Sequence, residues 1–500
     1  MSSGIHPVAI MHLLHLFDLS LIGRRDSVGL EILSGSSSLE TFTFGEIEIR
    51  SNQWAHLFYR QGLTQGDRLC VYLPSGPDLI LVYLASIKLG AIFVPVNILY
   101  KEREIARIVD DAEPRAMVAS KPISCTVPVW DLATFEAEAS RMPSHRPPLR
   151  LDGEAPAAMI YTSGTTGTPK GAVLTHHNFA TNAIALLSCW QIDSSDRFLL
   201  CLPLFHVHGL GNGLHCWLIS GCRLRLWEKF EREKAETMFL DFRPTLFFGV
   251  PTIYVYLLEL PKEACQEIGR CMRLFVSGSA PLAVEVSSDF QKKFGHSILE
   301  RYGMTETLMN ISNPYVGERR PGTVGFPLPG VSVLSLDDSG SAAGDNEIGE
   351  IYIRGPNVFS GYWRNSEATK SDLVKGYFRT GDLAVRSSDG YYTICGRKGD
   401  LIISGGFNVY PREVEEFLEQ QDGVAEAAVI GARDPVRGEV PVAYIVPRGD
   451  FDPDRLKEIC LKNLASFKIP QSFVEIPQLP RNVLGKIQKH LLPKGDPPWY

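Results

Sequence analysis

The chain has no long apolar run and no strong excess of charge of either sign. Its longest apolar region, Leu79–Val96, is interrupted by Lys88, Gly90 and Pro95, so it fits a buried helix followed by a strand better than a membrane span. The 50 basic and 57 acidic side chains give a net charge of −7, which offers no electrostatic reason to bind nucleic acid or an anionic membrane. We expect neither as a partner.

Patterns typical of metal sites and secreted proteins are also missing. The ten cysteines are scattered, with no CxxC pair and no Cys/His cluster at zinc-ligand spacing. In a chain of 500 residues this indicates reduced thiols packed as small apolar side chains. The apolar stretch Ile10–Ile22 contains His12, His15 and Asp18 and lacks a basic leader, so we expect no signal peptide and a cytoplasmic location.

The organisation that is present is that of an α/β protein with several structural units, which the length of the chain also requires. Between about residues 40 and 400, short apolar runs alternate with helical patterns, as in a mostly parallel sheet architecture. Leu69–Leu73 and Ala91–Val94 are predicted buried strands, with the helix Asp78–Leu89 between them. The proline-containing stretch Cys125–Gly153 predicts a loop-rich connection.

The last hundred residues predict a compact α+β unit. Pro411 opens a helix, Ala425–Gly431 and Val440–Val446 have the pattern of strands, and Asp452-Pro453 opens a second helix. The four glycines within Gly396–Gly406 allow the backbone to swivel ahead of this unit. The predicted domains are therefore residues 1–398 and a small mobile domain of residues 399–500.

The segment Tyr161–Gly171, YTSGTTGTPKG, follows an apolar strand-like run, Ala157–Tyr161. Glycines let backbone N–H groups turn toward a ligand, hydroxyls donate further hydrogen bonds, and one lysine supplies charge, which are the parts of a triphosphate cradle. The Walker-A pattern is absent. Most segments of this composition are surface loops, but five hydroxyls, three glycines and a lysine within Thr162–Gly171 favour contact with nucleotide phosphates.

This loop resembles the signature loop of the adenylate-forming superfamily, which holds acyl-CoA synthetases, luciferases and peptide-synthetase adenylation domains. The other motifs of the family follow in the expected order: Val94–Asn97, Leu202–Leu210, Arg273–Leu282, Glu300–Glu306, Tyr377–Asp382, Gly396-Arg397, Gly405–Glu413 and Pro480–Lys486. The resemblance covers nearly the whole chain. It implies a large α/β N-terminal domain of several subdomains, a small mobile C-terminal domain, and an ATP-dependent reaction that adenylates a carboxylic acid and passes the acyl group to coenzyme A.

The resemblance also assigns the nucleotide site. The implied ATP contacts are Thr162, Ser163, Gly164, Thr165, Thr166, Gly167, Lys170, Ser277, Gly278, Ser279, Ala280, Glu300, Arg301, Tyr302, Gly303, Met304, Thr305, Asp382, Arg397 and Lys486. Among them, Tyr302 is expected to stack on the base, and Asp382 and Arg397 to contact the ribose. Glu306 and Thr166 are the expected metal and catalytic oxygens, because Mg²⁺ that already holds phosphate oxygens prefers a further hard oxygen ligand.

Lys486, in PRNVLGK, resembles the catalytic lysine of the family. A positioned ammonium stabilises the negative charge that moves toward pyrophosphate during adenylation. A mobile domain can bring it in for that step and then turn another face toward coenzyme A. In related enzymes this lysine is acetylated, so a regulatory lysine acetyltransferase is a further expected partner. The family usually has Asp or Lys at the hinge position where this chain has Gly399, which leaves the role of a hinge side chain open.

Coenzyme A is the expected acceptor, because Gly405-Gly406 resembles the form of the motif in which glycines let the pantetheine approach the backbone. Few residues follow Lys486, so a fused carrier domain is not expected. Luciferase-like oxygenation shares this core and stays an alternative. A nucleotide-binding protein without catalysis is a second alternative, against which the phosphate loop, Glu306 and Lys486 argue.

The acid is predicted to be malonate. Arg273 lies on a strand-like run before Ser277, and its surroundings resemble those of malonate-activating ligases, in which the corresponding arginine pairs with the distal carboxylate. A small dicarboxylate needs such a cation, whereas a long-chain acid needs an apolar tunnel. His206 matches the family histidine that lines the acyl pocket. Methylmalonate or another short, medium-chain or aromatic acid stays open as an alternative, since Arg273 read alone fits a surface arginine and His206 a core histidine.

Overall fold

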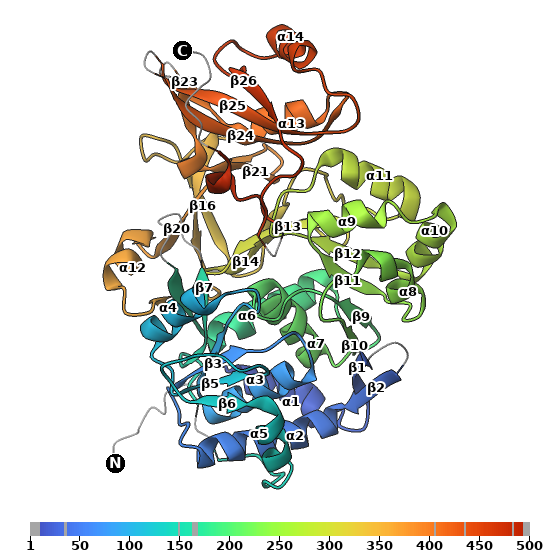
Figure 1. Cartoon of the computed structure of the whole chain (residues 1–500), viewed down its shortest axis with the longest axis vertical. Helices are drawn as coiled ribbons and strands as arrows, with labels where there is room; N and C mark the ends of the chain where they lie inside the picture. Colours follow the sequence, from blue (N-terminus) through green and yellow to red (C-terminus); the bar gives the residue numbers. More distant parts are fainter. Residues whose placement is uncertain are drawn as a thin grey trace.

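The structure, a computed structural model, describes residues 11–34, 38–148, 151–162, 169–404, 407–434, 437–482 and 485–493. The strands in these ranges form four sheets. The fourth sheet, built from the end of the chain, lies at one end of the molecule (Figure 1, orange and red). No helix in the same ranges has the length and apolarity needed to cross a membrane.

The first sheet has nine described strands and carries much of the site. In spatial order they are β15 (Phe326–Pro327), β14 (Leu308–Ser312), β13 (Leu299–Met304), β12 (Leu274–Ser277), β11 (Leu246–Gly249), β9 (Arg197–Leu200), β10 (Arg223–Leu226), β1 (Val28–Ser34) and β2 (Ser38–Thr43). The central strands β13 to β1 are parallel, and the edge strands pair antiparallel. The carboxyl ends of β11, β12 and β13 therefore meet at one edge, where α/β sheets bind ligands.

The second sheet has seven described strands and carries the phosphate loop. Its order is β18 (Gly361–Tyr362), β8 (Lys170–Thr175), β7 (Pro156–Thr162), β4 (Ile92–Pro95), β3 (Arg68–Tyr72), β5 (Ala116–Ala119) and β6 (Val129–Asp131). Strands β7 to β6 are parallel, whereas β8 and β18 pair antiparallel at one edge. The hairpin of β7 and β8 brackets residues 163–168, which lie outside the described residues.

One hydrophobic core joins the two large sheets, since strands of both contribute to it along with α1, α3, α6 and α7. Every residue of α3 from Leu79 to Leu89 is buried, which is typical of a helix packed on all sides. Pro77 occupies its first turn, and Gly90 ends it with a left-handed φ of 67°.

The described helices are α1 (Leu13–Leu21), α2 (Phe44–Arg60), α3 (Pro77–Leu89), α4 (Glu102–Ala112), α5 (Leu132–Ala139), α6 (His176–Trp190), α7 (His215–Ser220), α8 (Ala235–Leu240), α9 (Pro251–Leu257), α10 (Lys262–Cys271), α11 (Val284–Phe294), α12 (Ser366–Asp372), α13 (Pro411–Glu419) and α14 (Pro453–Asn463).

Lys88, the charge inside the longest apolar run, lies fully buried on α3. Its ammonium donates to Glu48 Oε2 at 2.6 Å, Ser51 Oγ at 2.7 Å and Asn52 Oδ1 at 2.7 Å, all on α2. Burial lowers the pKa of Lys88 to about 8. A buried ammonium is tolerated because its donors are satisfied, so this lysine ties α3 to α2.

Two smaller sheets complete the fold. The third contains β16 (Ser332–Leu336), β17 (Ile348–Arg354), β20 (Tyr377–Arg386), β19 (Leu373–Val374) and β21 (Tyr392–Arg397). The fourth contains β23 (Phe407–Val409), β22 (Ile402–Ser404), β25 (Gly438–Pro447), β24 (Val424–Asp434) and β26 (Ser472–Glu475), with α13 and α14 packed on its core. A 3₁₀ turn, Lys398–Asp400, connects β21 to β22 and thus the third sheet to the fourth.

The predicted architecture, a large N-terminal α/β domain and a small C-terminal domain, is confirmed. Mostly parallel pairing holds in the centres of the two large sheets, whereas the third sheet is antiparallel. The loop-rich prediction for Cys125–Gly153 was wrong in part, because this stretch contains β6 and α5. Asp131 begins α5 by accepting the Thr134 amide at 3.0 Å, an N-cap that four nearby prolines obscured.

Candidate active site

The nucleotide residues predicted from sequence gather at the carboxyl ends of β12 and β13. These strands are parallel neighbours, with Ser277 opposite Glu300. The segment from Ser277 to Ala280 follows the end of β12, Glu300–Met304 lies on β13, and Thr305 and Glu306 occupy the turn after it. The side chain of Glu300 accepts the Gly322 amide at 3.0 Å, and burial raises the pKa of its carboxyl to about 8.

Tyr302, Asp382 and Arg397 form one hydrogen-bonded group. The Tyr302 hydroxyl donates to Asp382 Oδ2 at 2.5 Å, and Arg397 Nε lies 2.9 Å from Asp382 Oδ1. Asp382 and Arg397 are cross-strand partners on β20 and β21, so the third sheet supplies both. The structure therefore brings together three residues that the motifs predicted separately.

Glu306 is a buried carboxylate, 6% exposed. Its Oε1 accepts the Tyr362 hydroxyl at 3.1 Å, and burial raises its pKa. The described residues contain no group of three or more His, Cys, Asp or Glu that could hold an ion. One carboxylate with free lone pairs suits Mg²⁺ that is shared with the phosphates of a bound nucleotide, since this ion often takes one or two protein carboxylates and keeps its other ligands from substrate and water.

The phosphate loop can be placed only at its base. Thr162 and Lys170 face each other as the last described pair of the β7–β8 hairpin. Lys170 Nζ lies 4.8 Å from the centroid of the Tyr362 ring. The predicted contacts Ser163, Gly164, Thr165, Thr166 and Gly167 lie outside the described residues, as do the predicted coenzyme A contacts Gly405 and Gly406.

Lys486 reaches the same site from the C-terminal domain. Gly485, with a left-handed φ of 76°, packs so closely on α9 that a β-carbon would lie 2.8 Å from Thr252 Oγ1. Lys486 keeps solvent contact, yet the protein around it and the charge of Arg397 lower its pKa, whereas Asp382 and Glu306 raise it. The charges that act on Lys486 belong to Arg397, Asp382 and Glu306, three of the residues predicted for the site from sequence.

Arg301 is a buried cation with no counter-ion among the residues that the structure describes. It is 5% exposed, its Nε and Nη2 have no hydrogen-bond partner, and no carboxylate in the described ranges pairs with it. Burial lowers its pKa to about 9, so it stays charged at neutral pH. A β-carbon on Gly278 would lie 2.4 Å from the guanidinium carbon, so Arg301 packs against the backbone that leaves β12.

Two neutral histidines lie beside Arg301. The His208 amide donates to His206 Nδ1 at 3.1 Å, and His208 Nδ1 lies 3.1 Å from Ser279 Oγ. Burial and the charge of Arg301 lower the pKa of His206 to about 4 and that of His208 well below its usual value. His208 Nε2 is buried without a partner. The histidines can therefore exchange hydrogen bonds with a ligand without adding positive charge.

Arg273, the predicted partner of a distal carboxylate, is held elsewhere. Its Nε and Nη2 lie 2.7 Å and 2.5 Å from the two carboxylate oxygens of Asp196, and Nη1 donates to the Trp190 carbonyl at 3.0 Å. Arg273 precedes β12, whereas the site follows Ser277, about 13 Å farther along the strand at about 3.3 Å per residue. Arg273 therefore pairs with Asp196 of this chain, at the amino ends of the strands, whereas the site lies at their carboxyl ends.

Sequence reasoning gave Arg301 only a nucleotide role and gave Tyr362 none. A signal for Arg301 was available, because an arginine inside the strand pattern LERYGM must be buried with its charge. No sequence pattern pointed to Tyr362, because the residues it contacts, Lys170 and Glu306, are distant from it in sequence.

The sequence pattern of AMP-binding enzymes matches residues 28–363, and that of the AMP-binding enzyme C-terminal domain matches residues 413–486. The sulfoacetate–CoA ligase of Cupriavidus necator is 34% identical over 91% of this chain and 93% of its own length. The malonate–CoA ligase of Arabidopsis thaliana is 32% identical over 87% of this chain and 79% of its own length. Other relatives, 31% or 32% identical, are named for long-chain fatty acids, indoleacetate or feruloyl-CoA.

Among solved structures, ATP-bound MatB from Rhodopseudomonas palustris is 35% identical to this chain. It superimposes with a TM-score of 0.90 and covers 96% of this chain and 98% of its own.

Proposed function

The chain belongs to the AMP-binding enzyme family, and we propose that the acid it activates is malonate. As an acyl-CoA ligase of this family it uses ATP, Mg²⁺ and coenzyme A, and it forms an acyl-adenylate before the thioester. The proposed reaction converts malonate, ATP and coenzyme A into malonyl-CoA, AMP and pyrophosphate through malonyl-AMP.

The unpaired guanidinium of Arg301 is the observation that carries this proposal. A buried cation without a partner is unfavourable, and a well-placed anion offsets much of that cost. The distal carboxylate of a short diacid supplies such an anion, whereas the apolar tail of a long-chain or aromatic acid does not. The relatives named for malonate and sulfoacetate act on short acids with a second acidic group, which supports the same class of substrate.

The proposed chemistry distributes three tasks among the described residues. Arg301 and the neutral histidines hold the distal carboxylate, so that an oxygen of the other carboxylate faces the α-phosphorus of ATP. The group of Tyr302, Asp382 and Arg397 holds the nucleoside. Lys486 stabilises the charge that develops as the acid oxygen bonds the α-phosphorus and pyrophosphate leaves.

Glu306 would hold Mg²⁺ together with the phosphates of ATP, and the bound ion would supply positive charge to offset part of the same negative charge. After pyrophosphate has left, the thiol of coenzyme A loses its proton to solvent and its sulfur bonds the malonyl carbonyl carbon. The bond from that carbon to the phosphate oxygen breaks, and AMP leaves with the electron pair.

The test compares Arg301→Gln with Arg273→Gln. We expect Arg301→Gln to lower kcat/KM for malonate by about 30- to 5000-fold, because loss of one partner of a buried charge pair removes about 2 to 5 kcal/mol. Use of propanoate, which lacks the distal carboxylate, should stay the same or rise. Arg273→Gln should lower thermal stability and leave the preference for malonate over propanoate intact.

Pyrophosphate release with a panel of acids, ATP, Mg²⁺ and coenzyme A measures these preferences. Full malonate activity in Arg301→Gln would contradict the assignment of the second carboxylate. A wide margin of medium-chain or aromatic acids over malonate in the native enzyme would instead identify a ligase for those acids.

A further inference from the structure

Tyr362 lies between two predicted phosphate-site residues that come from different sheets. It ends β18, whose two residues pair antiparallel with Val173 and Ala172 of β8. Its hydroxyl donates to Glu306 Oε1 at 3.1 Å, and Lys170 Nζ lies 4.8 Å from the centroid of its ring. One side chain thus contacts the carboxylate suited to Mg²⁺ and the lysine at the base of the phosphate loop.

The Tyr362 side chain is held firmly by its own neighbours. Its amide donates to Thr369 Oγ1 at 2.9 Å, and its ring packs edge-on against Phe359 with a centroid distance of 4.8 Å. Backbone hydrogen bonds fix the flanking residues to β8, because the Ser360 amide donates to the Val173 carbonyl at 3.0 Å and the Trp363 amide to the Gly171 carbonyl at 2.8 Å. The ring therefore keeps its place relative to the strand that begins with Lys170.

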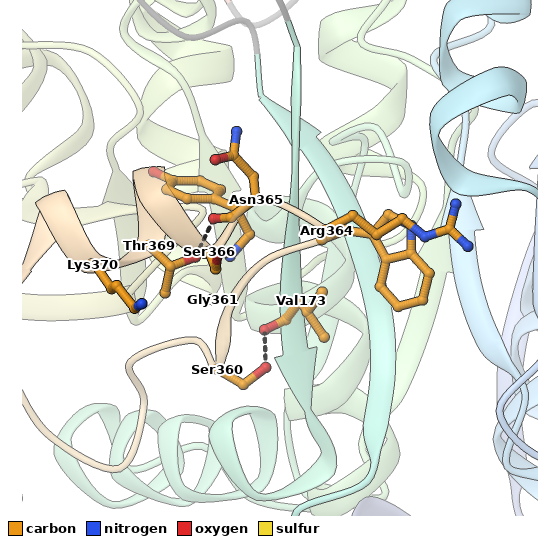
Figure 2. Close-up of a pocket in the computed structure, with 10 residues that line it drawn as sticks. Val173, Ser360, Gly361, Arg364, Asn365, Ser366, Thr369 and Lys370 are labelled. Carbon is orange, nitrogen blue, oxygen red and sulfur yellow. Dashed lines mark hydrogen bonds between the residues drawn. The ribbon is translucent and has the colours of Figure 1, made fainter.

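The other side of this segment is open. Ser360, Asn365, Thr369 and Lys370 help to line a pocket of about 550 Å³, in which Ser360 faces Val173 and Thr369 turns back toward Asn365 (Figure 2). Tyr362 is one of the residues that line this pocket. Its hydroxyl donates to Glu306.

A buried tyrosine often only satisfies its hydroxyl, but the partners of Tyr362 indicate more. In the ranges that the structure describes, Tyr362 is the only side chain that donates a hydrogen bond to Glu306, and Lys170 has no ion-pair partner there. Neither Glu306 nor Lys170 has another described side chain that orients it.

We infer that Tyr362 is a positioning residue, which aims Glu306 and Lys170 at the same bound triphosphate, Glu306 through its hydroxyl and Lys170 through its ring. The inference rests on the use of ATP and Mg²⁺ by this family, and it does not depend on which acid is activated. Partners that orient a metal ligand are typically worth 10- to 100-fold in metal affinity or activity. A cation held over an exposed ring is worth about 2- to 5-fold.

Two substitutions separate the two contacts. Tyr362→Phe keeps the ring and removes only the hydroxyl, so ATP binding without Mg²⁺ should stay unchanged while the Mg²⁺ concentration needed for half-maximal tightening of ATP binding rises about 10- to 100-fold. Tyr362→Leu removes both contacts and should also weaken metal-free ATP binding about 2- to 5-fold. Isothermal titration calorimetry with ATP, with and without Mg²⁺ and in the absence of any acid, measures both effects.

Tyr83→Phe is the matched control, because it removes the hydroxyl of a tyrosine that is likewise bonded to one side chain, His215 at 2.6 Å, but lies in the core. It should lower thermal stability and leave the Mg²⁺ dependence unchanged. If Tyr362→Phe behaves in the same way, with an unchanged Mg²⁺ requirement, the inference is overturned. The Tyr362→Phe result is decisive for the contact with Glu306, because this substitution removes one oxygen atom and keeps the packing of the ring. Because no acid is present, the result is independent of the malonate assignment.

Discussion

At the scale of single residues, Lys486 carries its charge into a crowded site. Burial and Arg397 disfavour the ammonium, whereas Asp382 and Glu306 favour it. A bound triphosphate adds negative charge beside it, so the ammonium is most stable while ATP occupies the site. This charge is needed only while pyrophosphate leaves, and we expect the lysine to matter to one half-reaction.

Lys486→Gln should therefore slow the formation of malonyl-AMP by about 100- to 1000-fold, the usual effect of removing one group that stabilises transition-state charge. Transfer of the malonyl group from added malonyl-AMP to coenzyme A should change by less than a few-fold. The two half-reactions can be measured separately, and equal losses in both would contradict this division. Acetylation of Lys486, which we propose as a means of regulation, removes the same charge and should have the same effect.

The residue types of the site could be predicted from sequence, but their pairing could not. Tyr302, Asp382 and Arg397 were assigned from their motifs, and the structure joins them in one group. Arg273 was predicted to hold the acid because its surroundings resemble those of malonate-activating ligases and because it precedes Ser277 on a strand-like run. In the structure Arg273 lies four residues before Ser277, which is about 13 Å along an extended strand, and Asp196 neutralises its charge. Among the described residues the buried cation without a carboxylate partner is Arg301, and that lack of a partner could be seen only in the structure.

At the scale of elements, strong local signals predicted helices and strands well. Pro77 and Gly90 delimit α3, and Asp452 caps α14 by accepting the Asp454 and Arg455 amides. The order of strands within each sheet could not be predicted, because it depends on contacts between segments distant in sequence. Two such unpredictable pairings position residues of the site. The pairing of β12 with β13 positions Arg301, and that of β8 with β18 positions Tyr362.

The packing of α1, α6 and α7 buries histidines and should make the fold sensitive to acid. His176 and His215 are fully buried, His176 lies 6.1 Å from His12 between ring centroids, and burial lowers the pKa of His176 and His215 to about 3. The folded state keeps both neutral, whereas the unfolded chain takes up protons near pH 6.5. The free energy of unfolding should therefore fall as pH drops from 6.5 toward 3, by up to about 1.4 kcal/mol per pH unit for each histidine.

Urea denaturation at pH 7, 6 and 5 measures this dependence. His176→Gln removes one titrating group and should flatten the slope by about 1.4 kcal/mol per pH unit at most. An unchanged slope in this variant would show that His176 does not carry the acid sensitivity.

At the scale of the whole molecule, the two domains meet at the 3₁₀ turn Lys398–Asp400. We propose that they divide between Lys398 and Gly399 and that the C-terminal domain rotates there between the two half-reactions. Lys398 Nζ lies 3.3 Å from Asp338 Oδ1 and 3.3 Å from Glu350 Oε2. A β-carbon at Gly399 would have no described atom within 4 Å. The ion pairs of Lys398 therefore fix the N-terminal side of the hinge, and no side chain at 399 restricts rotation beyond it.

Lys398→Ala should loosen the N-terminal side of the hinge, so that the C-terminal domain holds Lys486 in the site less firmly. A partly exposed ion pair contributes up to about 1 kcal/mol, so adenylation should slow by no more than about fivefold, and transfer from added malonyl-AMP should not slow. Lys398→Arg keeps the charge and serves as the control, and raised NaCl should reduce the difference between the two variants. If Lys398→Ala slows adenylation and transfer equally, Lys398 does not act through the hinge.

The unpaired charge of Arg301 also bears on fidelity in a cell rich in simple monocarboxylic acids. A pocket built to hydrogen-bond a missing group rejects the smaller analogue by about 10⁴-fold or more, whereas a pocket that only measures size discriminates far less well. Under the proposed function, acetate or propanoate would bring no second carboxylate to the Arg301 guanidinium, so their binding would leave a buried charge unpaired. Such an enzyme discards wrong acids before ATP is spent and needs no separate step to hydrolyse mistaken products.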